Sequence, residues 1–310
     1  MMPDFLIIGA AKSGTTSLFQ MLGQHPRVFL SPIKEPNYFS DDIRIENFSA
    51  TYRKNTFLNT ERYFAQEALP PLQLSFVRNT AQYQRLFGQA AAHACKGEAS
   101  TSYLYSETAA RNIYNAQPGM KLIAILRDPA DRAFSHYLMA LKYGHVRGSF
   151  RQALETDIQK KPKGWGRSEL FLELGLYGRQ LQRYYQTFPE NQIHIILYDD
   201  FLAQPRRVGE ECVHFLGLPL IDINWGQTHA NKAETPRHPF INQLLVRSGL
   251  KQGFKKIIPQ GLYNAFKRMV YTQTKGHSLA PQDRNWLLGY YKEDIALTAK
   301  LTGKNLGHWA

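Results

Sequence analysis

Near the start of the chain, the segment FLIIGAAKSGTTSL at 5–18 places a lysine and several hydroxyl groups directly after a hydrophobic run. Phe5 to Ile8 predict a buried strand, Gly9 and Gly14 bound a loop, and Thr15 to Leu22 predict a helix. The first N–H groups of a helix lack intrahelical partners and carry partial positive charge, so an anion placed there gains several hydrogen bonds. The segment therefore predicts a phosphate site.

The position of the lysine separates this loop from that of nucleoside triphosphatases. The spacing nearly fits G-x-x-x-x-G-K-[ST], but Lys12 precedes the second glycine. The predicted strand at 121–126 ends in Arg127 and Asp128, so a cation stands where a magnesium-binding acid would be expected. Two separated anion sites on one sheet would suit a nucleotide phosphorylated at both its 5′ and 3′ positions. The sulfate donor 3′-phosphoadenosine 5′-phosphosulfate (PAPS) is such a nucleotide.

At these residues the sequence resembles the PAPS-dependent sulfotransferase superfamily, most closely its carbohydrate branch related to heparan sulfate enzymes. KSGTTSL at 12–18 is similar to the family's 5′-phosphosulfate loop, and SPIKEPNYF at 31–39 to the K-E-P-x-x-F segment that carries the catalytic glutamate. LRDPADRAFSHY at 126–137 resembles the 3′-phosphate motif. More loosely, ILYDDFLAQP at 196–205 and the closing segment at 280–303 are similar to the family's later strand and terminal helix.

The resemblance implies a role for each matching residue. Sulfuryl transfer needs in-line placement of the reactants, stabilisation of charge on the leaving phosphate and removal of the acceptor proton. Glu35 is the candidate base, and Lys12 is the candidate stabiliser of the leaving group; no metal is required. The predicted donor-binding residues are Lys12, Ser13, Gly14, Thr15, Thr16, Ser17, Arg127, Ser135 and Arg237. The predicted acceptor-side residues are Lys34, Asn37, Tyr38 and Tyr103.

Simpler interpretations of the same residues stay open. Arg127 could pair with Asp128 or Asp131, and the hydroxyls at 15–17 could only cap the helix. Ser135 lies about two turns beyond Pro129, a favourable first helical residue, so Arg127 and Ser135 need not share one helix face.

The sequence predicts an α/β fold with a central parallel sheet flanked by helices, the P-loop-like fold that the resemblance also implies. Short apolar runs separated by helical patterns indicate parallel strands with crossover helices. These runs lie at 5–8, 28–30, 122–126 and 193–197, and 95–100 indicates a further strand end. We expect a single domain over 1–310, although two ordinary domains also fit this length. Residues 40–80 interrupt the pattern and predict a lid or insertion, with an irregular surface segment as the alternative.

The formal net charge of +13 is unevenly distributed. Residues 235–282 contain no Asp or Glu but many Lys and Arg, which predicts salt-sensitive attraction of anions. Apolar spacing from Leu244 to Ile258 predicts an amphipathic helix there. This helix could face the core with a solvated basic side. It could instead contact an acidic polysaccharide, an acyl-carrier protein or, peripherally, an anionic membrane surface.

Cys95 and Cys212 are the only cysteines, which indicates neither a disulfide framework nor a metal cluster. The amino terminus enters the first predicted strand almost at once, leaving too little for a secretion signal or a membrane span. We therefore expect a cytoplasmic protein. Eukaryotic relatives of the carbohydrate branch usually carry a membrane anchor and stem, so a bacterial-type soluble member is expected.

The acceptor hydroxyl is expected on a carbohydrate or glycolipid, with a carrier-bound acyl chain as the alternative. Asn37 stands where several polysaccharide-modifying relatives have a histidine, a departure that concerns the acceptor more than the reaction. Two other functional classes stay open. A phosphate-loop kinase is disfavoured by the displaced lysine. A nucleic-acid-binding protein is suggested by the charge, although no recognition motif accompanies it.

Overall fold

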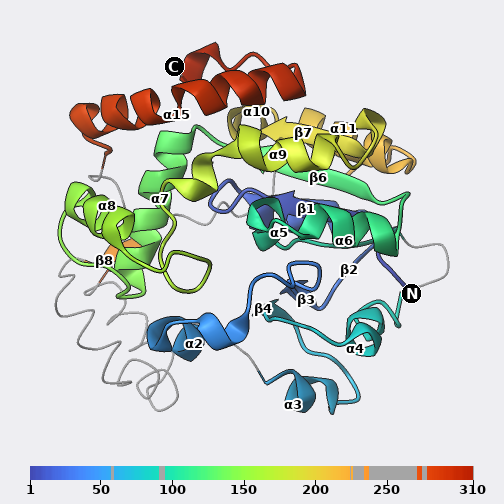
Figure 1. Ribbon diagram of the computed structural model, residues 1–310. Helices are drawn as coiled ribbons and strands as arrows, with labels where there is room; N and C mark the ends of the chain where they lie inside the picture. Colours follow the sequence, from blue (N-terminus) through green and yellow to red (C-terminus); the bar gives the residue numbers. More distant parts are fainter. Residues whose placement is uncertain are drawn as a thin grey trace.

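A five-stranded parallel sheet forms the centre of the protein (Figure 1), in the order β2–β5–β1–β6–β7. The computed structural model describes residues 1–56, 59–90, 95–223, 225, 234–236, 271–273 and 278–309. The sheet strands are β1 (Phe5–Gly9), β2 (Val28–Leu30), β5 (Cys95–Glu98), β6 (Lys121–Leu126) and β7 (Ile193–Leu197). Each of the predicted apolar runs forms one of these strands. The predicted α/β fold with a central parallel sheet is therefore confirmed.

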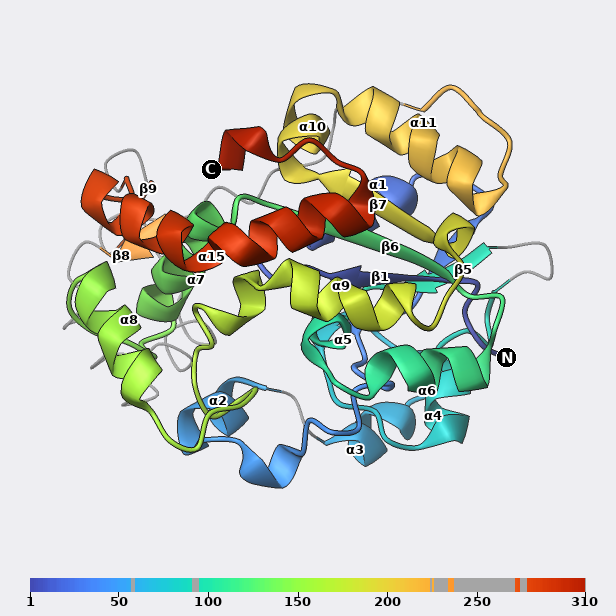
Figure 2. The ribbon, with the colours of Figure 1, turned by 45° about the horizontal axis from the view of Figure 1, so that its top comes forward.

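Helices cover both faces of the sheet (Figure 2). Because successive side chains of β1 point to opposite faces of the sheet, and helices pack on both, every residue of that strand is buried. Leu6 and Ile8 pack with α5 (Ser102–Tyr105), α6 (Ala109–Ala116) and α9 (Tyr177–Tyr185). Phe5 and Ile7 pack with α1 (Thr15–Leu22), α10 (Tyr198–Ala203) and α11 (Pro205–Leu216).

The segment predicted as a lid or insertion folds as short elements beside the main sheet. β3 (Ile33–Glu35) pairs in parallel with β4 (Leu72–Leu74), and Glu35 lies opposite Leu74. Between and after these strands come η1 (Ile45–Asn47), α2 (Ala50–Asn55), α3 (Thr60–Phe64) and α4 (Thr80–Arg85). Ile43, Phe48 and Phe76 form a small core of their own here. The segment at 40–80 thus folds against β3, the strand that ends in Glu35.

The remaining helices lie after β6 in the chain. They are α7 (Pro129–Lys142), α8 (Phe150–Gln159), η2 (Glu173–Gly175), η3 (Glu190–Gln192), α15 (Pro281–Thr302) and η5 (Gly307–Trp309). Buried Asp294 of α15 accepts hydrogen bonds from the N–H groups of Gly178 (2.8 Å) and Arg179 (3.0 Å), which fixes α15 on the start of α9. None of the described helices is long and apolar enough to cross a membrane.

Little of the predicted basic segment at 235–282 is described. A short antiparallel pair, β8 (Glu234–Pro236) with β9 (Tyr271–Gln273), flanks α7. Arg237 and the predicted amphipathic helix at 244–258 lie outside the described residues.

The strand order places β1 between β5 and β6, with β2 beyond β5 and β7 beyond β6. The chain therefore turns to opposite sides after β1 and after β5. Ligands of open α/β sheets bind at the carboxyl ends of strands where the connections diverge in this way. Those ends are occupied here by the loop after Gly9, by Glu98 and by Arg127.

Candidate active site

The loop between β1 and α1 presents backbone N–H donors, and no acidic side chain in the first turn of α1 competes with a ligand for them. Gly14 precedes the helix in a left-handed conformation, with φ of 94°, and a Cβ at this position would lie 2.8 Å from the ring of Tyr198. The first bond into the helix runs from Leu18 N–H to the carbonyl of Gly14 (3.0 Å). The N–H groups of residues 15–17 thus make no backbone bond within the described chain, and the first turn has no acidic residue. Gly14 leaves a cradle suited to an anion.

Lys12 lies in this loop, half-buried, with its Nζ 3.4 Å from the sulfur of Met139. Burial and, to a smaller extent, the positive charges of Arg127, Lys142 and Arg132 lower the pKa of Lys12 from 10.5 to about 8. The nearby carboxylate of Glu35 opposes the shift. A cation held among other cations is stabilised by an incoming anion.

Arg127 is placed at the end of β6 as predicted, and its guanidinium carbon lies 4.9 Å from the centre of the Tyr198 ring. Asp128 instead pairs with Arg284 of α15 (2.8 Å), which also pairs with Asp131. Arg127 forms no ion pair with any described carboxylate. Arg127 therefore does not pair with Asp128 or Asp131, and the charge of its guanidinium group is available to a ligand. Ser135 is partly buried on α7.

The carboxylate of Glu35 is held from both oxygens. Oε1 accepts hydrogen bonds from Lys34 Nζ (2.8 Å) and Gln73 Nε2 (3.3 Å), and Oε2 accepts one from Thr101 Oγ1 (3.0 Å). The Lys34 side chain is buried, so this ion pair is shielded from water. Glu35 therefore presents an oriented carboxylate in the electrostatic field of Lys12, the arrangement that a general base requires.

The other residues predicted on the acceptor side lie in the interior or at its margin. Asn37 is fully buried with φ of 51°; its amide donates to the carbonyls of Glu35 and Ser75, each at 2.8 Å. Tyr103 is also fully buried, and its hydroxyl accepts the N–H of Tyr38 (3.0 Å). Partly buried Tyr38 stacks on Tyr83 with ring centres 4.0 Å apart. Asn37 and Tyr103 thus support the Glu35 segment rather than face a cleft.

Sequence patterns did not identify Glu98, a fully buried carboxyl at the end of β5. It accepts hydrogen bonds from the hydroxyls of Tyr103 (2.5 Å), Ser100 (2.9 Å) and Tyr83 (3.2 Å). Burial raises the pKa of Glu98 to about 8, against the lowering effect of these hydrogen bonds. A strand-end acid followed by hydroxyl residues, in GEASTS at 97–102, is the signal that could have indicated it.

A second group missed from sequence lies around α7. Glu169 is within 3.5 Å of His136 Nε2 and 3.2 Å of His145 Nδ1. Burial alone would raise the pKa of Glu169, but the hydrogen bonds from the two histidines hold it well below its usual range. Burial lowers the pKa of His136, and the charges of Arg132 and Lys12 act in the same direction. No cluster of His, Cys, Asp and Glu able to hold a metal ion occurs among the described residues.

One cavity of about 310 Å³ lies between η1, the end of α5, the loop at 163–167 and α9. Tyr105 and Trp165 line it with ring centres 5.9 Å apart. Its basic residues are Arg44, Lys163, Arg167, Arg179 and Arg183, and its acids are Asp42, Glu107 and Glu173. Of these basic groups, only Lys163 forms an ion pair with a described carboxylate, that of Glu173.

Tyr52 is hydrogen-bonded to the wall of this cavity. The indole Nε1 of Trp165 donates to the hydroxyl of Tyr52 (2.8 Å). Burial raises the pKa of Tyr52; the hydrogen bond from Trp165 opposes this shift, and the charges of Glu35 and Glu169 add to it. The hydroxyl of Tyr52 is therefore bonded to Trp165 and influenced by the charge of Glu35.

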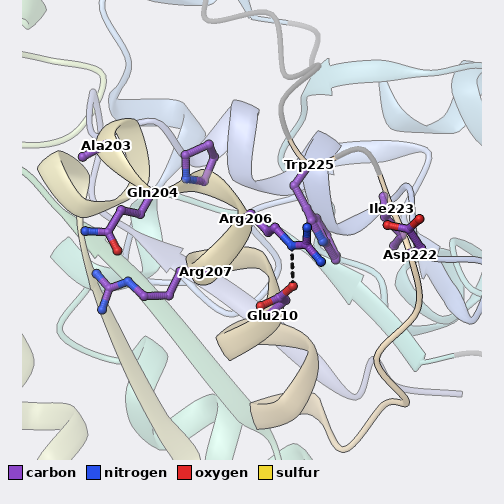
Figure 3. Close-up of a pocket in the computed structure, with 9 residues that line it drawn as sticks. Ala203, Gln204, Arg206, Arg207, Glu210, Asp222, Ile223 and Trp225 are labelled. Atoms are coloured by element: carbon purple, nitrogen blue, oxygen red, sulfur yellow. Dashed lines mark hydrogen bonds and ion pairs between the residues drawn. The ribbon is translucent and has the colours of Figure 1, made fainter.

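Another cavity, of about 860 Å³, lies between the start of α11 and the residues Asp222, Ile223 and Trp225 (Figure 3). Arg206 and Glu210 at its wall pair with each other at 2.8 Å, and Arg207 and Asp222 also line it. It contains none of the predicted site residues, so the chemistry is assigned to the β1 edge and not to this hollow.

Comparisons with known proteins indicate the family of the chain. The model of the "Sulfotransferase family" matches residues 3–222. A bifunctional heparan sulfate N-deacetylase/N-sulfotransferase from Drosophila melanogaster is 27% identical over 227 residues, which cover 72% of this chain and 20% of that protein. Its Homo sapiens counterpart 3 is 26% identical over 98% of this chain and 30% of its own length.

Carbohydrate sulfotransferase 15 from Rattus norvegicus is 24% identical over 77% of this chain and 48% of that protein. The chain therefore spans less than half the length of these curated relatives. Among solved structures, a sulfotransferase from Alicyclobacillus acidocaldarius superposes with a TM-score of 0.69 at 24% identity, covering 100% of this chain and 99% of that one. This likeness concerns the fold.

Proposed function

The chain belongs to the sulfotransferase family, and from that premise we propose that it moves the sulfuryl group of PAPS to an acceptor hydroxyl by in-line transfer. The observation that carries this proposal is the arrangement at the carboxyl end of β1. Lys12 and the N–H groups at the start of α1 would form one anion site, Arg127 would form a second, and the hydrogen-bonded carboxylate of Glu35 lies near enough for its charge to raise the pKa of Lys12. An O-sulfotransferase needs these three parts.

The residues present fit the donor. The cradle at Gly14, the N–H groups of residues 15–17 and Lys12 would hold the 5′-phosphosulfate. Arg127, with Ser135, would hold the 3′-phosphate. The donor supplies an activated sulfuryl group, and adenosine 3′,5′-bisphosphate (PAP) is the product. Ser13, buried in the loop, supports its shape, and Arg237 would complete the donor site only if the chain outside the described residues brings it there.

The chain's own residues then account for the proton and charge changes. Glu35 removes the proton of the acceptor hydroxyl while the acceptor oxygen bonds to sulfur and the bond from sulfur to the phosphate oxygen breaks. Lys12 stabilises the negative charge that grows on the leaving phosphate oxygen. Lys34 keeps the Glu35 carboxylate oriented through the 2.8 Å ion pair.

The cavity beside Tyr52 supports a carbohydrate acceptor. Its aromatic pair, Tyr105 and Trp165, offers ring faces on which a sugar can stack. Arg44 and Arg179, which form no ion pair with a described carboxylate, would offer bidentate donors to carboxylate or sulfate groups. An acyl chain would instead need a mainly apolar channel. The acceptor is therefore proposed to be a sugar hydroxyl, on a glycan or a glycolipid, in preference to a carrier-bound acyl chain. Cys95 and Cys212, buried as free thiols, support a cytoplasmic location.

Thermal shift with three ligands tests the donor proposal. PAP at a hundred times its dissociation constant adds about 2.7 kcal/mol of stability, which corresponds to a rise of roughly 5 °C in melting temperature. ATP with magnesium and an oligonucleotide should shift it far less. A larger shift with ATP and magnesium would support a kinase instead, and one with the oligonucleotide would support a nucleic-acid-binding protein.

An acceptor screen with labelled PAPS tests the second half of the proposal. Neutral oligosaccharides, uronate-containing oligosaccharides, glycolipids and acyl chains on carrier protein are compared. The variant Glu35→Gln serves as a matched inactive control, because it keeps the shape of the side chain but not its basicity. Label transfer to a saccharide by the wild type alone is expected. Transfer only to carrier-bound chains would contradict the carbohydrate assignment.

A further inference from the structure

Every residue of the turn after β5 is hydrogen-bonded to the segment that carries Glu35. Each of residues 99–103 forms a hydrogen bond with one of residues 34–38. With the donor first, these bonds run from Ala99 N to Lys34 O (2.9 Å), Asn37 N to Ser100 Oγ (2.9 Å), Thr101 Oγ1 to Glu35 Oε2 (3.0 Å), Ser102 Oγ to Asn37 Oδ1 (2.5 Å) and Tyr38 N to Tyr103 OH (3.0 Å). The orientation of Glu35 therefore depends on the shape of this turn.

Glu98 sits at the centre of these contacts without touching Glu35 through any hydrogen bond of its own. The hydroxyls of Ser100 and Tyr103 each accept a backbone N–H of the Glu35 segment and each bond to the Glu98 carboxyl. Glu98 thus closes two short hydrogen-bond chains, one ending at Asn37 and the other at Tyr38. Its burial means that water cannot replace it in either chain.

We propose that Glu98 is a positioning residue for sulfuryl transfer: through Ser100 and Tyr103 it fixes the backbone of residues 37–38, and thereby aims the carboxylate of Glu35 at the acceptor hydroxyl. This inference rests on the proposed function, because it assigns Glu98 a task in that reaction. It predicts that the network sets kcat and leaves donor affinity unchanged, since the donor contacts lie on the β1 and β6 loops.

Two tyrosines provide a matched test. Tyr83 and Tyr103 are both fully buried, and both donate to Oε1 of Glu98. Only the Tyr103 hydroxyl also holds the Tyr38 N–H. Tyr103→Phe is therefore expected to lower kcat at least tenfold, because small misplacement of a reacting group costs up to about 10²-fold. Tyr83→Phe, which loses a hydroxyl from the same carboxyl, should keep kcat within about twofold of wild type.

Substitutions of Glu98 itself provide a rescue test. Glu98→Ala removes the centre of both chains and should lower kcat by about 10²-fold. Glu98→Gln retains an oxygen that accepts from Tyr103 and places an amide beside Ser100, so kcat should recover to within severalfold of wild type at pH 7. The raised pKa of Glu98 supports this choice, since the neutral acid is the state that glutamine imitates.

The assay is release of PAP from PAPS, with water or the acceptor found in the screen as the nucleophile, alongside calorimetric titration with PAP. Unchanged PAP affinity with reduced kcat in Tyr103→Phe and Glu98→Ala is expected. Equal kcat in Tyr83→Phe and Tyr103→Phe would overturn the positioning role, as would parallel loss of PAP affinity, which indicates a general structural defect. A wild type that releases no PAP from PAPS would contradict the proposed function and the inference that rests on it, whereas an active wild type with equal kcat in the two tyrosine variants would contradict the inference alone.

Discussion

Replacing Lys12 by methionine should make the ligand-free protein more stable and the enzyme much slower. Methionine keeps an unbranched side chain of similar length beside Met139 but removes the charge. A pKa near 8 in place of 10.5 means that the protonated lysine costs the folded state about 3 kcal/mol at neutral pH. The causes are burial and the charges of Arg127, Lys142 and Arg132, so the cost disappears with the ammonium group.

The pH dependence of this gain has a definite sign. The folded pKa lies below the unfolded value, so the cost is complete below pH 8 and shrinks as the pH rises from about 8 to 10.5. Urea unfolding of Lys12→Met at pH 7 should show a gain approaching 3 kcal/mol, and the gain should be smaller at pH 9.5. Lys12→Arg is the control, because it keeps the charge and therefore its cost.

The turnover of Lys12→Met should fall although its stability rises. Loss of a preorganised stabiliser of the leaving group costs roughly 3 to 4 kcal/mol of barrier, so kcat of Lys12→Met should fall by about 10²- to 10³-fold. A variant that unfolds more readily than wild type would refute the reasoning from burial and like charge, and one that keeps normal turnover would refute the role of Lys12 in stabilising the leaving group. Both measurements use the same purified protein in the same buffer.

Three further predictions concern the other parts of the site. Glu35→Gln should lower kcat by about 10² to 10⁴ in a turnover assay while calorimetry finds PAP affinity nearly intact; normal turnover would exclude this glutamate as the base. Arg127→Ala should lose roughly 10- to 100-fold in affinity for PAP but little for adenosine 5′-monophosphate, and an equal loss for both would be inconsistent with a 3′-phosphate contact. Gly14→Ala should lose at least about 1 kcal/mol of unfolding free energy, because its φ is 94° and the new Cβ would meet Tyr198; unchanged stability would argue against that geometry.

Local patterns were sufficient to predict most of the frame. The apolar runs that form β1, β2, β6 and β7 are short and bounded by turns, and those of β1, β6 and β7 are mostly buried, which makes them recognisable without tertiary information. The helix at 15–22 and the start of α7 at Pro129 were also predicted, because glycine before one and proline at the other restrict the backbone locally.

The contacts that organise the site were not predictable in the same way, since they join residues far apart in sequence. Arg284 approaches Asp128 across more than 150 positions, and this pairing is what leaves Arg127 available. Asn37 was expected on the acceptor side because it lies near Glu35 in the motif, and Tyr103 because the segment at 97–113 resembles the family's stretch after the third strand. The structure instead uses their polar groups inside the hydrogen-bond network of Glu98. Sequence spacing identifies a chemically capable segment but not which of its side chains point outward.

The most direct test of the proposed chemistry is calorimetric titration of the wild-type protein with PAP and with adenosine 5′-monophosphate, which differ only in the 3′-phosphate. Binding at both anion sites predicts that PAP binds at least tenfold more tightly. Equal affinity for the two nucleotides would contradict a site built to hold adenosine by its two phosphates.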